Sequence, residues 1–147
     1  RGIVGTLRGG DDAEFAPQPG LTDLERLATT VDSPKVEVTV HDGVGDPGPT
    51  VGSALYRVAQ EAVTNARRHA RDATTVSVSV EGGEHEVTLV VDDDGELAPT
   101  TGSAANGFGL IGMSERAELL GGSFDAGPRP GGGWRVEAVI PRHGVSA

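Results

Sequence analysis

The stretch that decides the fold is LYRVAQEAVTNARRHAR, residues 55–71. It contains no Gly or Pro and is rich in Ala, Arg, Glu and Gln, so it predicts a helix. At 100° per residue, its apolar face carries Leu55, Val58, Ala59, Ala62, Ala66 and Ala70. Beside that face, Glu61, Asn65 and His69 recur every four residues and stack on successive turns. This border is where a pocket can open, although a surface helix with a polar rim has the same pattern.

Composition limits the function classes. A chain of 147 residues suits one domain with its own core. A formal net charge of -10 argues against a nucleic-acid partner and against an anionic membrane surface, since both need a basic face. The absence of Cys excludes disulfides, zinc–thiolate sites and a thiol nucleophile. No signal peptide and no apolar run of about 18 residues is present, which predicts a soluble domain.

The rest of the chain alternates between helical and strand patterns. Residues 1–8 predict the end of a helix, 9–20 a linker, and Thr22 with Glu25 a capping box that opens a short helix through about residue 30. Strands are predicted at 35–41, 74–80, 85–91, 123–126 and 134–140, a second long helix at 110–120, and a lid at 96–107. This order predicts a two-layer α/β sandwich, with three helices on one face of a mixed, mostly antiparallel sheet. Residues 1–20 would precede one domain at 21–147.

Asp93 and Gly95 directly follow a strand with a fully apolar end. A carboxylate there is costly unless a group donates to it, and the exocyclic amine of adenine is such a donor. Guanine presents an acceptor at the same edge and would be repelled. Gly95 lets a flat base approach the backbone. Of the three consecutive aspartates, the spacing to Gly95 selects Asp93, rather than Asp92 or Asp94, as the residue that faces the base. An Asp at the end of a strand is also common in proteins without any ligand there.

Two further groups of residues suit a phosphate ligand. Asn65 offers an amide oxygen to magnesium, which keeps several waters and takes one or two protein oxygens, and Glu61 offers a base or a ligand for metal-bound water. Arg68 lies on the Asn65 side and is either a phosphate ligand or a solvated arginine. Gly107 and Gly109 open the helix that begins at Leu110, where free N–H groups and the helix dipole favour an anion.

These motifs occur in the order found in a known family. QEAVTNARRHA resembles the N box of sensor histidine kinases, DDDG their first glycine box, and GFGLIGMSERAELLGG their second. APQPGL and the closing GGGWRVEAVIP are most similar to the subfamily that pairs with LuxR/NarL-type response regulators. The resemblance implies the Bergerat ATP-binding fold, shared with gyrase-type ATPases and Hsp90. It also implies ATP and Mg2+ as cofactors, and donation of the γ-phosphate to a histidine on a dimerisation domain.

The resemblance also assigns residues. Asn65 and Glu61 would be the catalytic and magnesium-binding pair, with Glu61 where related ATPases keep their catalytic glutamate. Arg68 or His69 would approach the phosphates, and Asp93 would read adenine. The implied nucleotide-binding set is Asn65, Arg68, His69, Asp93, Gly95, Gly107, Gly109 and Leu110.

Two positions depart from the family pattern. Leu97 stands where the family's first box usually has its second glycine. Trp134 stands where many relatives have a Thr that helps to anchor water near adenine. These departures keep open an interaction module with impaired nucleotide binding. A serine kinase of the anti-sigma type on the same fold is the other alternative.

The histidines bear on the reaction. None of His41, His69, His85 and His143 is predicted to stand on an exposed helix beside an acidic residue, as the family's phosphoacceptor does. The resemblance therefore implies that the acceptor lies on the protein's own dimerisation domain, in a homodimer, with a LuxR/NarL-type regulator as the next partner. It implies a cytoplasmic domain without nucleic-acid or membrane contact, and leaves open whether the full-length protein is membrane-anchored.

Overall fold

The computed structural model describes residues 19–29, 34–97 and 109–142. The elements in chain order are η1 (Leu21–Leu27), β1 (Lys35–Val40), η2 (Asp42–Val44), α2 (Pro49–His69), β2 (Ala70–Arg71), β3 (Thr75–Gly82), β4 (Glu86–Asp93), β5 (Glu96–Leu97), α4 (Leu110–Leu119), β6 (Ser123–Pro128) and β7 (Trp134–Pro141). Within the described residues, no helix is long and apolar enough to cross a membrane.

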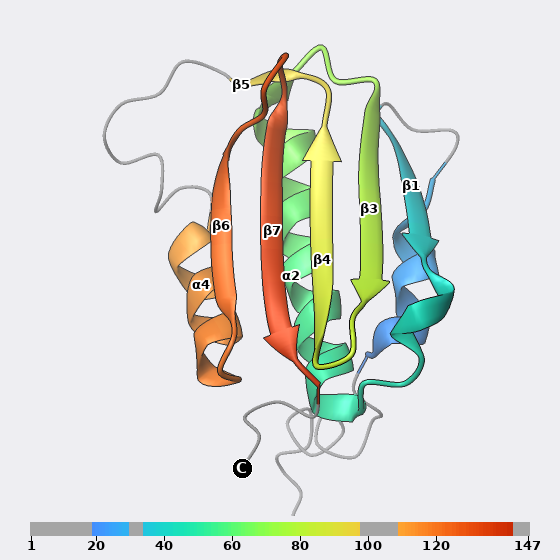
Figure 1. Ribbon diagram of the computed structural model, residues 1–147. Coiled ribbons are helices and arrows are strands. Elements are labelled where there is room, and N and C mark those ends of the chain that lie inside the picture. The colour runs from blue at the N-terminus through green and yellow to red at the C-terminus, as the bar shows by residue number, and fades with distance from the viewer. Residues whose placement is uncertain (1–18, 30–33, 98–108, 143–147) are drawn as a thin grey trace, which may run out of the picture.

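The main sheet has the strand order β1-β3-β4-β7-β6. β1 runs parallel to β3, and every other neighbouring pair in this sheet is antiparallel. Figure 1 shows α2 behind the middle of the sheet, α4 behind the β6 edge and η1 behind the β1 edge, so all three helices cover the same face. The predicted two-layer α/β sandwich with a mixed, mostly antiparallel sheet is therefore confirmed.

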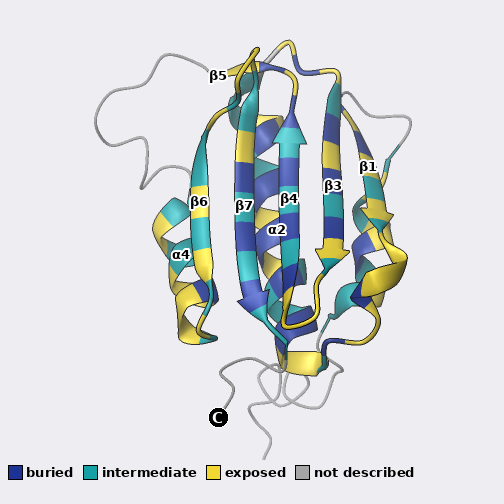
Figure 2. Ribbon diagram, viewed as in Figure 1, coloured by how far each residue is buried: buried dark blue, intermediate teal, exposed yellow. Residues whose placement is uncertain are grey.

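The core lies between α2 and the sheet. Five of the six residues of the predicted apolar helix face are buried, from Leu55 to Ala66, and Ala70 is half-buried. In β3, β4 and β7, buried and less buried residues alternate, so one face of each strand packs on the helices (Figure 2). The polar border of α2 lies near the ends of the central strands, since Asn65 and His69 line one pocket with Asp93 of β4 and Trp134 of β7.

Several predicted boundaries were wrong. α2 begins at Pro49, six residues before the predicted start, because a proline is well suited to the first helical turn. It ends at His69, and the next two residues form β2, which pairs with β5. The predicted lid had no strand pattern, yet its first two residues make β5.

The predicted capping box was also wrong. The first helix is a 3-10 helix from Leu21 to Leu27, and the Gly20 N–H donates to the Asp23 carboxylate at 2.7 Å. The shorter side chain of Asp23, three residues after Gly20, makes the contact that the sequence assigned to Glu25. The predicted helix end at 1–8, nearly all of the linker 9–20 and most of the lid lie outside the described residues, as do Gly107 and His143.

The Arg142 side chain links three segments at one end of the sheet, namely η2, the β3–β4 turn and the end of β7. The Arg142 guanidinium donates hydrogen bonds to the backbone carbonyl oxygens of Gly43 (2.8 Å), Val44 (2.8 Å) and Gly83 (2.9 Å). The segments approach closely, since a Cβ on Gly82 would lie 2.4 Å from the Gly43 oxygen. Arg142 thus fastens η2 and the β3–β4 turn to the end of β7.

We expect Arg142→Ala to lower the free energy of unfolding by about 1–2 kcal/mol, because carbonyls near the protein surface lose a charged donor. Arg142→Lys should recover only part of this, since one ammonium group cannot reproduce the planar fork of the guanidinium. Urea unfolding measures both. Arg26→Ala is the control, because that side chain is 80% exposed and forms a surface ion pair with Asp23. An unchanged midpoint for Arg142→Ala would contradict the expectation.

Candidate functional site

A pocket opens between α2 and the ends of β4 and β7. The centre of a water-sized sphere can occupy about 20 Å³ of it, and the surrounding non-protein space, open solvent included, is about 390 Å³. Small and apolar residues form most of the wall, and four side chains with polar groups interrupt it. The lining residues are Ala62, Asn65, Ala66, His69, Ala70, Val91, Asp93, Trp134 and Val136. Such an apolar cavity with a few placed polar groups is typical of a small-molecule site.

Asp93 is the one buried charged residue among those described, with 5% of its surface exposed. Its Oδ1 accepts a hydrogen bond from the Gly95 N–H at 3.0 Å. Burial raises the pKa of Asp93, and the charges of Asp94 and Asp92 raise it further, whereas the Gly95 N–H and the Arg129 guanidinium lower it. A buried carboxylate at a pocket wall is an acceptor that a ligand's N–H group can satisfy.

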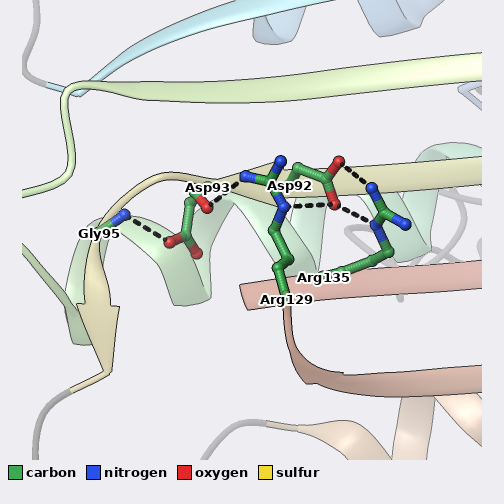
Figure 3. A network of polar contacts seen from close by, with 5 residues as sticks. All are labelled: Asp92, Asp93, Gly95, Arg129 and Arg135. Carbon is green, nitrogen blue, oxygen red and sulfur yellow. Dashed lines mark hydrogen bonds and ion pairs between the residues drawn. The ribbon is translucent and has the colours of Figure 1, made fainter. Parts of the chain in front are cut away.

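The neighbouring aspartates have other partners. Asp92 is held by Arg135 through two hydrogen bonds, Nε to Oδ1 at 2.7 Å and Nη2 to Oδ2 at 3.0 Å (Figure 3). Asp94 accepts from the N–H groups of Thr74 (2.8 Å) and Thr75 (3.2 Å), and from the Thr74 hydroxyl, which is the main reason that its pKa is lowered. The structure therefore places Asp93 alone of the three at the pocket.

Asn65 and His69 also line the pocket, one helical turn apart on α2. Both are half-buried. Two other residues predicted on this side of α2 do not line the pocket: Glu61 and Arg68 are exposed. Only part of the predicted polar stripe, Asn65 and His69, therefore lines the pocket.

Glu61 meets a second predicted element instead. Gly109 caps the N-terminus of α4 with a positive φ of 69°, and a Cβ there would lie 2.9 Å from Glu61 Oε2. The positive φ favours glycine here, and the short distance shows that the Glu61 carboxylate lies against Gly109. Leu110, the next residue, packs against the core. The Glu61 carboxylate thus lies beside the N-terminus of α4, which is the positive end of the helix dipole. The predicted metal-binding residue of α2 is therefore in contact with the predicted phosphate-binding segment at Gly109.

Two residues of the site neighbourhood were not found from the sequence. Arg129 and Gly133 bound the β6–β7 turn and both contact the Asp93 backbone, as described below. The sequence feature that could have pointed to this turn is the run of three glycines from Gly131 to Gly133. In the structure all three have positive φ angles. Such a run marks a tight turn in close contact with another backbone, but it does not indicate which backbone.

A family model described as histidine kinase-, DNA gyrase B-, and HSP90-like ATPase matches residues 50–144. The chain belongs to this family, because the match covers well over half of its length. The predicted resemblance to sensor histidine kinases is confirmed, and membership of a family of ATPases indicates ATP as the nucleotide.

Two curated relatives are sensor kinases. Sensor histidine kinase YxjM of Bacillus subtilis is 39% identical over 93 residues, which is 63% of this chain and 22% of YxjM. Signal transduction histidine-protein kinase/phosphatase DegS of Brevibacillus brevis is 36% identical over 102 residues, 69% of this chain and 26% of DegS. The chain thus spans about a quarter of the length of these relatives.

Solved structures agree on the fold. A blue-light activated histidine kinase of Erythrobacter litoralis superposes with a TM-score of 0.62 at 19% identity, over 89% of this chain and 43% of that one. The catalytic domain of histidine kinase ThkA gives a TM-score of 0.55 at 15% identity, over 73% of this chain and 77% of that one. At these identities the likeness concerns the fold.

Proposed function

We propose that this chain is the ATP-binding catalytic domain of a two-component sensor histidine kinase. It would donate the γ-phosphate of Mg-ATP to a histidine on a dimerisation domain. The observation that carries the proposal is the buried Asp93 carboxylate at the wall of an apolar pocket, in a chain of this ATPase family. The names of the curated relatives support the kinase reaction.

Adenine would occupy the pocket beside Asp93. Its exocyclic amine donates to the carboxylate, while Val91, Val136 and the alanines of α2 supply apolar contact to the ring. The approach of the base to the backbone would be eased at Gly95. Guanine would place a carbonyl oxygen against the buried carboxylate, and the two acceptors would repel each other. The site should therefore prefer ATP and ADP to GTP.

Magnesium suits the oxygens that α2 offers. The described residues contain no cluster of three or more His, Cys, Asp or Glu that could hold a metal. A magnesium ion usually takes one or two protein oxygens and completes its shell with water and phosphate. Asn65 would supply an amide oxygen and Glu61 a carboxylate. Bound magnesium would neutralise charge on the phosphate oxygens during transfer.

The remaining predicted residues would serve the phosphates. The N-terminus of α4 at Gly109 and Leu110 presents N–H groups, with Gly107 preceding it in the chain. His69 lies in the pocket wall and Arg68 on the exposed side of the helix. Glu61 would either hold magnesium-bound water or accept the proton that the acceptor imidazole releases. In the transfer, the acceptor imidazole nitrogen attacks the γ-phosphorus, the bond to the β,γ-bridging oxygen breaks, and ADP leaves.

The partners follow from the same proposal. The domain at 21–147 would act on its own dimerisation domain, whose last helix would end within residues 1–20, in a homodimer. The phosphoryl group would pass to a LuxR/NarL-type response regulator. We place this domain in the cytoplasm.

The test uses the single tryptophan of the chain. Trp134 lines the pocket, so its fluorescence reports directly on occupation. We expect a saturable change with ATP in the presence of Mg2+, a weaker response without Mg2+, and little response to GTP at the same concentrations. The absence of any ATP response, both in fluorescence and in calorimetry, would overturn the proposal in favour of an interaction module without nucleotide.

Asn65→Ala tests the magnesium assignment. We expect its ATP affinity to be nearly the same with and without Mg2+, while thermal unfolding stays close to that of the parent, because Asn65 is only half-buried. Gln60→Ala, an exposed position on the same helix, is the matched control and should retain the full Mg2+ effect. If Asn65→Ala bound Mg-ATP like the parent, the ion would have another ligand.

A further inference from the structure

We propose that Arg129, in the turn between β6 and β7, is a positioning residue that holds Asp93 in place to receive the nucleobase. This rests on the proposed function and deepens it, since it assigns a role in base recognition to a residue outside the pocket wall. Arg129 does not line the pocket and would not touch the nucleotide.

The geometry joins Arg129 to the end of β4 at two points. Its Nη1 donates a hydrogen bond to the backbone carbonyl oxygen of Asp93 at 3.1 Å. Its Nε lies 3.9 Å from Oδ1 of Asp92. Figure 3 shows the guanidinium reaching both aspartates from the turn. One side chain therefore contacts the backbone of Asp93 and the side chain of the residue before it.

The turn that carries Arg129 is itself fixed against Asp93. The Arg129 N–H donates to the Gly133 carbonyl at 2.9 Å, and the Gly132 N–H donates to the Arg129 carbonyl at 3.1 Å. Gly133 has a φ of 92°, and a Cβ there would lie 2.1 Å from the Asp93 carbonyl oxygen. The turn thus lies directly on the backbone of Asp93, and only glycine permits this approach.

Asp93 needs such support because of its place in the strand. It is the last residue of β4, where pairing ends, and it stands between two other carboxylates. Asp94 is held by Thr74 and Thr75 on one side. On the other side Arg135 contacts the Asp92 carboxylate, whereas Arg129 contacts both Asp92 and Asp93. Of the two arginines, only Arg129 bonds directly to Asp93, so its loss should let the Asp93 carboxylate move out of position.

Arg129→Ala should weaken ATP binding about tenfold, the scale of one lost charged hydrogen bond. The matched control is Arg135→Ala, which makes the same charge change and removes the two hydrogen bonds to Asp92, but leaves the Asp93 backbone held. Its ATP affinity should stay within about twofold of the parent. Thermal unfolding of each variant, and Trp134 fluorescence without nucleotide, would verify that the variants are folded.

The pH profile separates positioning from a merely structural role. The charged or titratable groups around the Asp93 carboxyl are Asp92 and Asp94 on its own strand end, Arg129 from the turn, and His69 in the facing wall of the pocket. Arg129 lowers the pKa of Asp93, so its removal should raise that pKa. On acidification, ATP affinity should therefore fall at a higher pH in Arg129→Ala than in the parent. Arg135→Ala should follow the parent, and Arg129→Lys should restore the profile.

The outcomes are distinct. If the parent binds ATP and Arg129→Ala matches it in affinity and pH profile, the positioning role is wrong. An equal loss of affinity in Arg135→Ala would also overturn it, since the effect would then come from Asp92 or from net charge. If the parent itself does not bind ATP, the proposed function fails, and this role with it.

Discussion

Asp93→Ala is expected to weaken ATP binding by about 1–3 kcal/mol, or roughly 5- to 150-fold. The carboxylate is almost fully buried at the pocket wall, and its loss leaves the adenine amine without an acceptor in a place that water reaches poorly. Calorimetric titration with ATP measures the change. Glu96→Ala, which replaces an exposed carboxylate three residues later, is the control and should bind like the parent.

Asp93→Asn is the sharper variant. It keeps the shape of the side chain and one acceptor oxygen for the Gly95 N–H, but it presents a donor group toward the amine of adenine. Affinity should therefore fall although no volume is lost. Equal ATP affinity in this variant would move the role to Asp92 or Asp94, both of which would first have to leave their present partners.

Stability and binding should respond to acid in opposite directions at this residue. Burial raises the pKa of Asp93 above its unfolded value, so between the two values the folded state binds more protons than the unfolded state. The contribution of Asp93 to stability therefore improves as pH falls through its folded pKa. ATP affinity should fall over the same range, because the carboxylate is being neutralised. Asp93→Asn should abolish both responses, which urea unfolding and titration at several pH values would reveal.

The second large effect concerns catalysis. Incubated alone with γ-labelled ATP, this chain should bind the nucleotide and remain unlabelled. His41 lies directly after β1, with Nε2 3.3 Å from the Ser79 hydroxyl, His85 lies in the β3–β4 turn, and His69 lines the pocket. His41 caps the short 3-10 helix η2 beside Asp42, but none of these described histidines lies within an exposed α-helix beside an acidic residue. Transfer needs an acceptor nitrogen in line with the γ-phosphate, and none of the three is placed as the family's acceptor is.

A dimerisation hairpin added in trans should become labelled at its histidine, and Asp93→Ala should reduce this labelling in proportion to its lost affinity. Acid-labile label on the 147-residue chain itself would contradict the separation of donor and acceptor. It would point to His143, which lies outside the described residues.

The layer arrangement was predictable because it depends on regular patterns. The small-residue face of α2 and the alternating valines of the central strands are repeated signals, and each repetition supports the same burial. The pairing of β2 with β5 was missed because two-residue strands are too short to show any periodicity. The start of α2 was missed because a proline and a glycine before a helix are equally compatible with a loop.

Sequence spacing could group site residues that lie on the same helix or at the end of the same strand. It could not predict contacts between residues of two different elements. The spacing of Asn65 and His69 along a helix, and of Asp93 from Gly95, singled out the three polar residues Asn65, His69 and Asp93, which all line the pocket. Helical periodicity could not show that Glu61 turns toward Gly109 rather than into the pocket. The contact of Arg129 with Asp93 joins positions 36 residues apart, and it depends on how β6, β7 and β4 pair.

The contacts of Arg142 also bear on how long the folded chain persists. Its bonds to Gly43 and Val44 span 99 and 98 positions of the sequence, so we expect them to form late in folding, when distant segments have already come together. Interactions made after the rate-limiting step of folding leave the refolding rate unchanged and slow only the reverse reaction. Loss of the Arg142 side chain should therefore raise the unfolding rate and leave the refolding rate unchanged, so the native state would have a shorter lifetime.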